Sequence, residues 1–171
     1  MDNIAEQLIA KYPTSGDKAK LALISLGGIL LASAVMFFAI ITGFMVLVLV
    51  AVGLIAGTVY YISGAYVEYE YIITNDEMDI DKVIGKRKRR RMITVDLTAA
   101  EAFAPYPSEQ EYKADATVFA TSGGEKDAYY LVTSHPSYGK VKIIFNPNDR
   151  IREAMMQEFP ATLKAKIKHN L

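Results

Sequence analysis

The chain lacks cysteine, contains only two histidines and carries no charge over a long central stretch. Without cysteine there are no disulfides, no thiol catalysis and no cysteine metal sites, which fits a reducing compartment. His135 lies in an expected turn and His169 near the C-terminus, so the histidines do not form a pattern of metal ligands. We therefore expect neither a metal centre nor a cofactor.

The uncharged stretch runs from Leu21 to Val67. One helix needs about 20 apolar residues to cross a bilayer, and this stretch is more than twice that length. Thr42 and Gly43 interrupt it near the middle. The sequence therefore excludes a fully soluble protein and predicts two membrane-spanning helices, near residues 20–41 and 44–63.

Small residues recur in both predicted spans and have two explanations. Either they let the two helices approach closely, or they reflect the general frequency of glycine in membrane helices. The residues are Gly27, Gly28, Ala32 and Ala34 in the first span, and Ala51, Gly53, Ala56 and Gly57 in the second.

The distribution of positive charge predicts the orientation of this hairpin. Lys11, Lys18 and Lys20 precede the first span, whereas the connecting turn carries no charge. Because positively charged flanks stay in the cytoplasm, we expect a multi-pass protein of the cell membrane with both termini cytoplasmic.

The first 19 residues are expected to form a short cytoplasmic segment with one helix over residues 3–11. Asn3 is a candidate N-cap with Glu6 three positions later, and Pro13 ends the pattern. The sequence leaves open whether this helix lies on the bilayer or belongs to a mobile end. Thr14 and Asp17 then form a second capping box before the first span.

Beyond the hairpin, the pattern changes from helical to strand-like. Val67, Tyr69, Tyr71 and Ile73 alternate with polar positions, which is typical of a half-buried strand. Turns at residues 75–76 and 85 separate it from two further strands, over residues 78–84 and 87–95. The simplest interpretation is a three-stranded antiparallel meander.

A second group of strands follows a proline- and alanine-rich connection over residues 98–107. Candidates are residues 116–121, 128–134 and 140–145, joined by turns at residues 122–124 and 136–139. A helix is expected over residues 147–159, with Asn146 as N-cap and Ile151, Met155 and Phe159 buried. Residues 161–171 are expected to be a mobile basic tail.

Several segments together resemble a known family. They are the strand Tyr69–Asn75, the triplet Met78–Asp79–Ile80, the turn Gly85–Lys86–Arg87, the segment Thr94–Leu97 and the N-terminal Glu6–Gln7–Leu8. The chain is similar to an uncharacterised clostridial and Firmicutes membrane family, a domain of unknown function with a bacterial pleckstrin-homology-like domain. The phosphoinositide-binding pattern of eukaryotic pleckstrin-homology domains cannot be aligned residue by residue, so the resemblance does not imply headgroup binding.

The resemblance implies an α+β fold in which an N-terminal transmembrane helical hairpin precedes a pleckstrin-homology-like antiparallel barrel capped by a C-terminal α-helix. The expected parts are residues 1–19 for the N-terminal segment, 20–63 for the hairpin, 64–160 for the barrel with its helix, and 161–171 for the tail. No catalytic residues come with the resemblance.

The most distinctive local feature is a run of six consecutive cations, Lys86, Arg87, Lys88, Arg89, Arg90 and Arg91. On a strand, only about half of them can contact one surface at once. They can bind anionic lipid headgroups or a protein partner, or they can pair across strands with Glu68, Glu70, Asp79 and Asp81. The residues alone do not decide between these interpretations.

Other chemistry has weaker support. The chain after the hairpin contains 16 basic and 16 acidic residues, so we expect no nucleic-acid partner. Ser134 and His135 are adjacent beside a proline turn and do not resemble a catalytic triad. We therefore predict a membrane-anchored, non-enzymatic binding or scaffold module, with a structural subunit of a larger membrane complex as the alternative.

Overall fold

The computed structural model describes residues 3–107, 112–123 and 127–169. The chain divides into two compact units, a helical unit over Pro13–Tyr66 and a second unit made of Met1–Tyr12 and Val67–Leu171. The first residues of the chain therefore belong to the second unit. This differs from the predicted boundaries, which separated residues 1–19 from residues 64–160.

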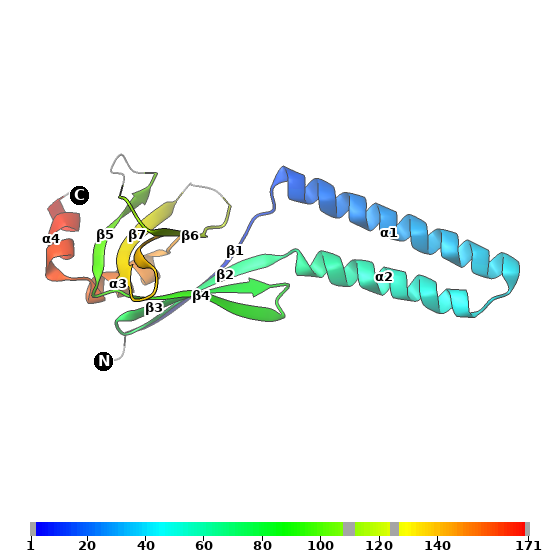
Figure 1. Cartoon of the computed structure of the whole chain (residues 1–171), viewed down its shortest axis with the longest axis horizontal. Helices are drawn as coiled ribbons and strands as arrows, with labels where there is room; N and C mark the ends of the chain where they lie inside the picture. The colour runs from blue at the N-terminus through cyan, green and yellow to red at the C-terminus, as the bar shows by residue number, and fades with distance from the viewer. Residues whose placement is uncertain (1–2, 108–111, 124–126, 170–171) are drawn as a thin grey trace. The chain divides into compact units, whose positions relative to one another are not determined.

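The helical unit is an antiparallel pair, α1 (Ser15–Thr42) and α2 (Val46–Gly64) (Figure 1). Thr14 caps α1 in the predicted capping box with Asp17, and Gly43 ends α1 with a φ of 68°. Both helices are long and apolar enough to cross a membrane. The predicted break at residues 42–43 is confirmed, but α1 begins several residues before the expected start.

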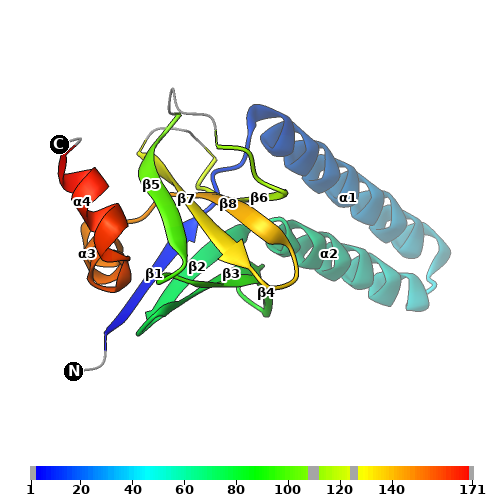
Figure 2. The ribbon, with the colours of Figure 1, turned by 60° about the vertical axis from the view of Figure 1, so that its left-hand side comes forward.

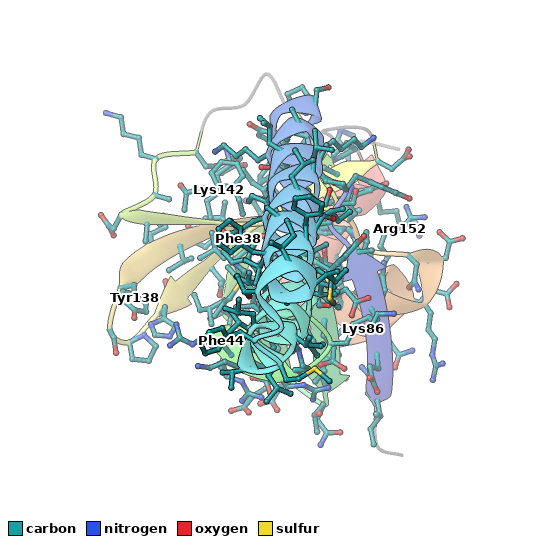
Figure 3. The ribbon with its side chains drawn as sticks, turned by 90° about the vertical axis from the view of Figure 1, so that its right-hand side faces the viewer. Phe38, Phe44, Lys86, Tyr138, Lys142 and Arg152 are labelled. Carbon is teal, nitrogen blue, oxygen red and sulfur yellow. The ribbon has the colours of Figure 1, made fainter. Side chains whose placement is uncertain are left out.

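Small residues hold the two helices together. Ala32, Ala39 and Ala51 are the buried residues of the pair, and Gly28 lies against Thr58 so closely that a Cβ atom would stand 2.4 Å from Thr58 Oγ1. Large apolar side chains such as Phe38 and Phe44 are instead exposed (Figure 3). A helix pair with small residues inside and large apolar residues outside is suited to a lipid environment.

The second unit contains two four-stranded sheets (Figure 2). The first is antiparallel in the order β1 (Ile4–Ala10), β2 (Val67–Thr74), β3 (Glu77–Ile84), β4 (Lys88–Asp96). The second has the order β5 (Ala100–Tyr106), β7 (Ala128–His135), β8 (Gly139–Phe145), β6 (Ala116–Ala120). Helices α3 (Asp149–Glu158) and α4 (Ala161–His169) follow.

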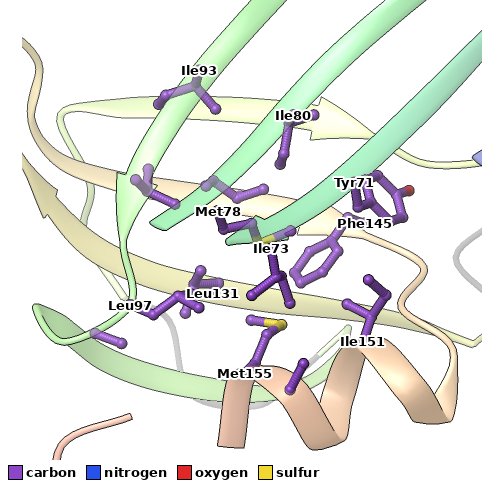
Figure 4. Close-up of a cluster of buried hydrophobic side chains, with 14 of the residues drawn as sticks. Tyr71, Ile73, Met78, Ile80, Ile93, Leu97, Leu131, Phe145, Ile151 and Met155 are labelled. Carbon is purple, nitrogen blue, oxygen red and sulfur yellow. The ribbon is translucent and has the colours of Figure 1, made fainter. Parts of the chain in front are cut away.

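A common core fills the space between the two sheets and α3 (Figure 4). Tyr71 packs edge-to-face on Phe145, with ring centroids 5.4 Å apart. The Tyr71 hydroxyl donates to the carbonyl of Ala120 and accepts from the N–H of Asn146 at 3.3 Å. As predicted, Ile151, Met155 and Phe159 are buried.

The predicted helix over residues 3–11 is wrong, because this segment is strand β1. β1 pairs with β2 along its whole length, from Ile4 opposite Thr74 to Ala10 opposite Glu68. Ala5 is buried in the core, and the Gln7 amide bonds the carbonyl of Asn146 at 2.9 Å. The whole helical unit is therefore inserted between two neighbouring strands of one sheet.

Four other expectations need correction. The connection over residues 98–107 contains strand β5, because alanine side chains fit the close contact with β7. β6 pairs in parallel with β8, so the turn after β6 does not form the expected hairpin with β7. Gly124, which belongs to that expected turn, lies outside the described residues.

The N-cap of α3 is Asn148, two residues after the predicted Asn146. Residues of the expected tail form α4, which buries Leu163.

The described strands do not close into a barrel, because they form two separate sheets. The predicted barrel therefore describes the fold only loosely. The α+β class and the C-terminal helix of the prediction are present.

Candidate functional site

The basic run occupies the turn between β3 and β4 and the first half of β4. Gly85 and Lys86 both have positive φ angles, 59° and 57°, and the N–H of Arg87 closes the turn on the carbonyl of Ile84 at 3.1 Å. Two successive positive φ angles are typical of tight hairpin turns. All six cations from Lys86 to Arg91 are exposed.

A β-bulge determines which way each cation faces. Ile80 lies opposite Ile93, whereas the next residue, Asp81, lies opposite Arg91. Met92 is therefore an extra residue in β4, and it reverses the alternation on that strand. Ile93 points into the core, and Arg91 points to the other face of the sheet.

Two of the six cations pair with carboxylates on the face of the sheet that points away from the core. Arg89 Nη2 lies 2.7 Å from Glu70 Oε2 and 2.8 Å from Glu70 Oε1. Arg91 lies 2.9 Å from Asp79 and 3.0 Å from Asp81. These contacts support the intramolecular interpretation for Arg89 and Arg91, and the role of the basic run in binding a lipid or a partner stays a prediction.

Glu70 and Asp81 are nearly inaccessible although they lie on an outer sheet face, each with an exposed fraction of 3%. Burial, followed by a hydrogen bond with the Glu6 side chain, raises the pKa of Glu70 above its ordinary 4.5, and Arg89 only partly opposes this. The hydrogen bond from Arg91 to Asp81 raises the pKa of the guanidinium. Arg91 is therefore held in its charged form beside the buried Asp81, and Arg89 lies against the buried Glu70.

The alternate cations lie on the opposite face, which is the core side of the sheet. Arg90 stands directly across from Lys82, and Lys88 stands across from Ile84. Within the ranges that the structure describes, no carboxylate lies within salt-bridge distance of Lys82, Lys88, Arg90 or the turn residue Lys86. The cations of the hairpin thus include a paired set, Arg89 and Arg91, and an unpaired set, Lys82, Lys86, Lys88 and Arg90.

Lys82 is the member of the unpaired set that sequence reasoning missed. In the sequence it stands alone after an acidic stretch, and only the β3–β4 register places it beside the basic run. The periodicity of β3 was a usable signal, since Lys82 shares its face with Ile80 and Ile84.

The other candidates have structural roles. His135 Nδ1 accepts from the N–H of Ser137 at 3.0 Å, and its ring packs on Tyr138 with centroids 4.8 Å apart. Asp79 accepts from the Thr94 hydroxyl at 2.5 Å. Among the described residues, no group of three or more histidines, aspartates and glutamates is suited to hold a metal ion.

Comparisons with known proteins identify the family. The family model described as "Bacterial PH-like domain (DUF6106)" matches residues 1–165. The searches of curated proteins and of solved structures gave no match. The family match spans both the apolar helix pair and the two-sheet unit, so the chain belongs to the bacterial PH-like domain family DUF6106.

Proposed function

We propose that this protein is a membrane-anchored, non-enzymatic binding module whose PH-like unit contacts an anionic lipid surface or a protein partner in the cytoplasm. The observation that carries the proposal is the position of the helix pair. It is inserted between β1 and β2, neighbouring strands of the PH-like sheet. Both ends of the anchor therefore enter the same folded unit.

The connections between anchor and sheet are short. Ala65 and Tyr66 alone separate α2 from β2, and the N–H of Lys11 bonds the carbonyl of Val67 at 2.9 Å. This hydrogen bond continues the β1–β2 ladder to the point where the chain leaves the sheet. A unit held by two adjacent strands stays near its bilayer, which suits a module that acts at a membrane surface.

The cytoplasmic placement rests on charge. Lys11, Lys18 and Lys20 flank the start of α1, and the turn between α1 and α2 has no charged residue. Because cationic flanks favour the cytoplasmic side, the PH-like unit is proposed to face the cytoplasm.

Extraction of membranes tests the anchor. The full chain, expressed in its host, is expected to remain in membranes that are washed with alkaline carbonate and to be released only by detergent. Release by carbonate would contradict the proposal, because a peripheral protein behaves in that way.

A structural subunit of a larger membrane complex is the second candidate, and an open groove on the helix pair favours it. Gly53 and Gly57 line this groove of about 570 Å³ together with apolar side chains, and neither glycine has a neighbour within 4 Å of an added Cβ. Small residues spaced four apart allow another helix to approach.

A matched pair of variants separates the two candidates. If the groove holds a subunit, Gly53→Leu with Gly57→Leu is expected to reduce the size of the detergent-extracted complex on a native gel, whereas Gly27→Leu leaves it unchanged. Gly27 is a suitable control because it also has open space around an added Cβ. An unchanged size in both variants would leave the binding module as the better account.

A further inference from the structure

The core-side face of the β3–β4 hairpin carries a group of cations that no carboxylate among the described residues pairs with. Lys82 and Arg90 are directly opposite each other in the antiparallel register, and Lys88 is the next residue on the same side of β4. Like charges in directly opposite positions destabilise a sheet. The structure thus maintains three neighbouring cations at a cost to its own stability.

Carboxylates are available on the neighbouring positions of β2 and β3, but they lie on the other face of the sheet. Glu70, Asp79 and Asp81 are engaged by Arg89 and Arg91. The bulge at Met92 separates the two sets, because it places Arg91 on the acidic face while Ile93 remains in the core. Among the described residues, the carboxylates of this hairpin are therefore turned away from Lys82, Lys88 and Arg90, and these cations face solvent without an ion-pair partner.

Apolar side chains border these cations. Ile84 lies opposite Lys88 on one side and opposite Val67 on the other, and Tyr69 lies between Lys82 and Ile9. Ile9, Val67 and Ile84 are each partly exposed. A surface that mixes partly exposed apolar residues with cations fits the headgroup region of a bilayer, where phosphates lie beside the acyl chains.

We propose that Lys82, Lys88 and Arg90, together with Lys86 in the turn, bind the phosphate groups of anionic lipids. This inference rests on the proposed function, and it names both the lipid class and the surface. Val67 pairs with Ile84, one residue before the turn, and only two residues separate Val67 from the end of α2. The cations thus lie at the end of the sheet that a link of two residues joins to the apolar helix α2.

Charge attraction of this kind is sensitive to salt. Each basic residue near an anionic surface raises the association constant roughly fivefold, the equivalent of about 1 kcal/mol. Removal of three such residues is therefore expected to weaken the contact roughly a hundredfold. The attraction decays over about 8 Å at physiological ionic strength, so raised salt is expected to release the hairpin.

The absence of cysteine in the chain allows a direct test. The full chain with Ile84→Cys, labelled with an environment-sensitive dye, is reconstituted into nanodiscs of phosphatidylcholine with or without phosphatidylglycerol. We expect phosphatidylglycerol to shift the emission to shorter wavelength at low salt, and added salt to reverse the shift. Equal emission in both kinds of disc would overturn the proposal.

Variants identify the side chains responsible. Lys82→Gln with Lys88→Gln and Arg90→Gln is expected to abolish the shift, whereas Lys113→Gln with Lys166→Gln and Lys168→Gln, which removes the same charge from other exposed sites, retains it. Loss of the shift in both triple variants would show that only net charge matters and would overturn the assigned face.

A single variant separates binding from folding. Lys82→Glu places a carboxylate across from Arg90, so thermal stability is expected to stay equal or rise while the lipid-dependent shift is lost. Lys166→Glu carries the same change of charge on exposed α4 and is expected to retain the shift. A Lys82→Glu chain that is stable and still responds to phosphatidylglycerol would reject the proposal.

Two further outcomes are informative. One distinguishes a lipid phosphate from a soluble phosphate, and the other distinguishes failure of the lipid-binding proposal from failure of the membrane anchor. Inorganic phosphate that reproduces the shift in phosphatidylcholine discs would identify a soluble anion as the ligand and overturn the lipid assignment. A chain that resists carbonate extraction but ignores phosphatidylglycerol would reject the lipid face and leave the membrane anchor intact.

Discussion

At the scale of single residues, Glu70 shows how charge is handled inside this sheet. It faces Glu6 of β1, Asp81 of β3 and Arg89 of β4 on the side away from the core. Its neighbours thus include two carboxylates and one guanidinium, in a site with almost no solvent. Burial and the hydrogen bond with Glu6 raise the pKa of Glu70 above its ordinary value, so the folded chain binds this proton more tightly than the unfolded chain does.

We predict that Glu70→Gln changes stability in a pH-dependent way. A carboxyl group whose folded pKa is raised contributes stability below its ordinary pKa of 4.5, and that stability is lost as pH rises through the folded value. The difference in melting temperature between the Gln variant and the parent chain is therefore expected to grow in favour of the variant from below pH 4.5 towards neutrality. Thermal unfolding in detergent measures it.

The same titration also has a clear contrary outcome. If the Arg89 contact outweighed burial at Glu70, the folded pKa would be lowered, and the parent chain would gain on the variant as pH rises. A difference that shrinks with increasing pH would thus contradict the assigned cause.

The cations of the β3–β4 hairpin show how much of a charge arrangement the sequence pattern alone can predict. Alternation along a strand predicts that half of the six cations face each side, and Arg89 and Arg91 do pair with acidic residues named from the sequence. The sequence does not reveal the bulge at Met92, because a bulge depends on the partner strand. For the same reason, the cation that completes the opposite face, Lys82, was not predicted.

At the scale of elements, β1 is the segment for which local pattern and structure disagree. Ile4 and Leu8 are spaced as on a helix face, and Asn3 with Glu6 resembles a capping box. On the strand, Ile4 and Leu8 are exposed and Ala5 is buried opposite Ile73. Pairing with a strand beyond the helix pair overrides the weak local preference, and no short-range signal reports such a partner.

A matched pair of substitutions tests β1. Ala5→Asp would bury a carboxylate in the core and is expected to cost several kcal/mol, a large share of a typical domain's stability. Ile4→Asp, at a side chain that is 60% exposed, is expected to change stability by at most about 0.5 kcal/mol. Thermal unfolding of the full chain compares them, and equal effects would speak against the pairing of β1 with β2.

Elements with strong local periodicity were predicted more successfully. The inward face of β2, formed by Tyr69, Tyr71 and Ile73, is buried as expected. In contrast, β5 is rich in alanine and contains Pro105, so its composition resembles a connection. The parallel pairing of β6 with β8 is non-local and has no signature in the intervening turn.

The contact between α1 and α2 gives a second prediction at this scale. An added Cβ at Gly28 would stand 2.4 Å from Thr58 Oγ1, and that hydroxyl is held by its bond to the carbonyl of Leu54 at 2.8 Å. Gly28→Ala is therefore expected to destabilise the helix pair by about 1–3 kcal/mol. Unfolding in mixed detergent micelles, followed by circular dichroism, measures the loss.

Two controls accompany the Gly28 variant. Gly27→Ala, with no atom within 4 Å of the added Cβ, is expected to leave the helix pair as stable as before or slightly more stable. Thr58→Ala in the Gly28→Ala background removes the obstructing atoms and is expected to restore part of the loss. Equal destabilisation by Gly27→Ala and Gly28→Ala would contradict the close contact.

At the scale of the whole molecule, the inserted helix pair constrains the topology. β1 precedes α1, β2 follows α2, and the two strands pair over seven residues on each strand. If the helices cross a membrane, the hairpin must therefore start and finish on the same side of it, with the turn between α1 and α2 on the other side. This constraint is stronger than the charge pattern, because it holds for either orientation of the hairpin.

Cysteine labelling distinguishes the sides, since the chain has no cysteine of its own. We predict that Met45→Cys, in the turn after α1, reacts with an impermeant maleimide in right-side-out vesicles from the host. Ile4→Cys and Ser137→Cys are expected to react only after the vesicles are opened, because the lysines at the start of α1 favour the cytoplasmic side, where we propose that the PH-like unit lies. All three side chains that are replaced are exposed. Reaction of both Ile4→Cys and Ser137→Cys in sealed vesicles would invert the orientation, whereas reaction of only one of them would contradict the β1–β2 pairing itself.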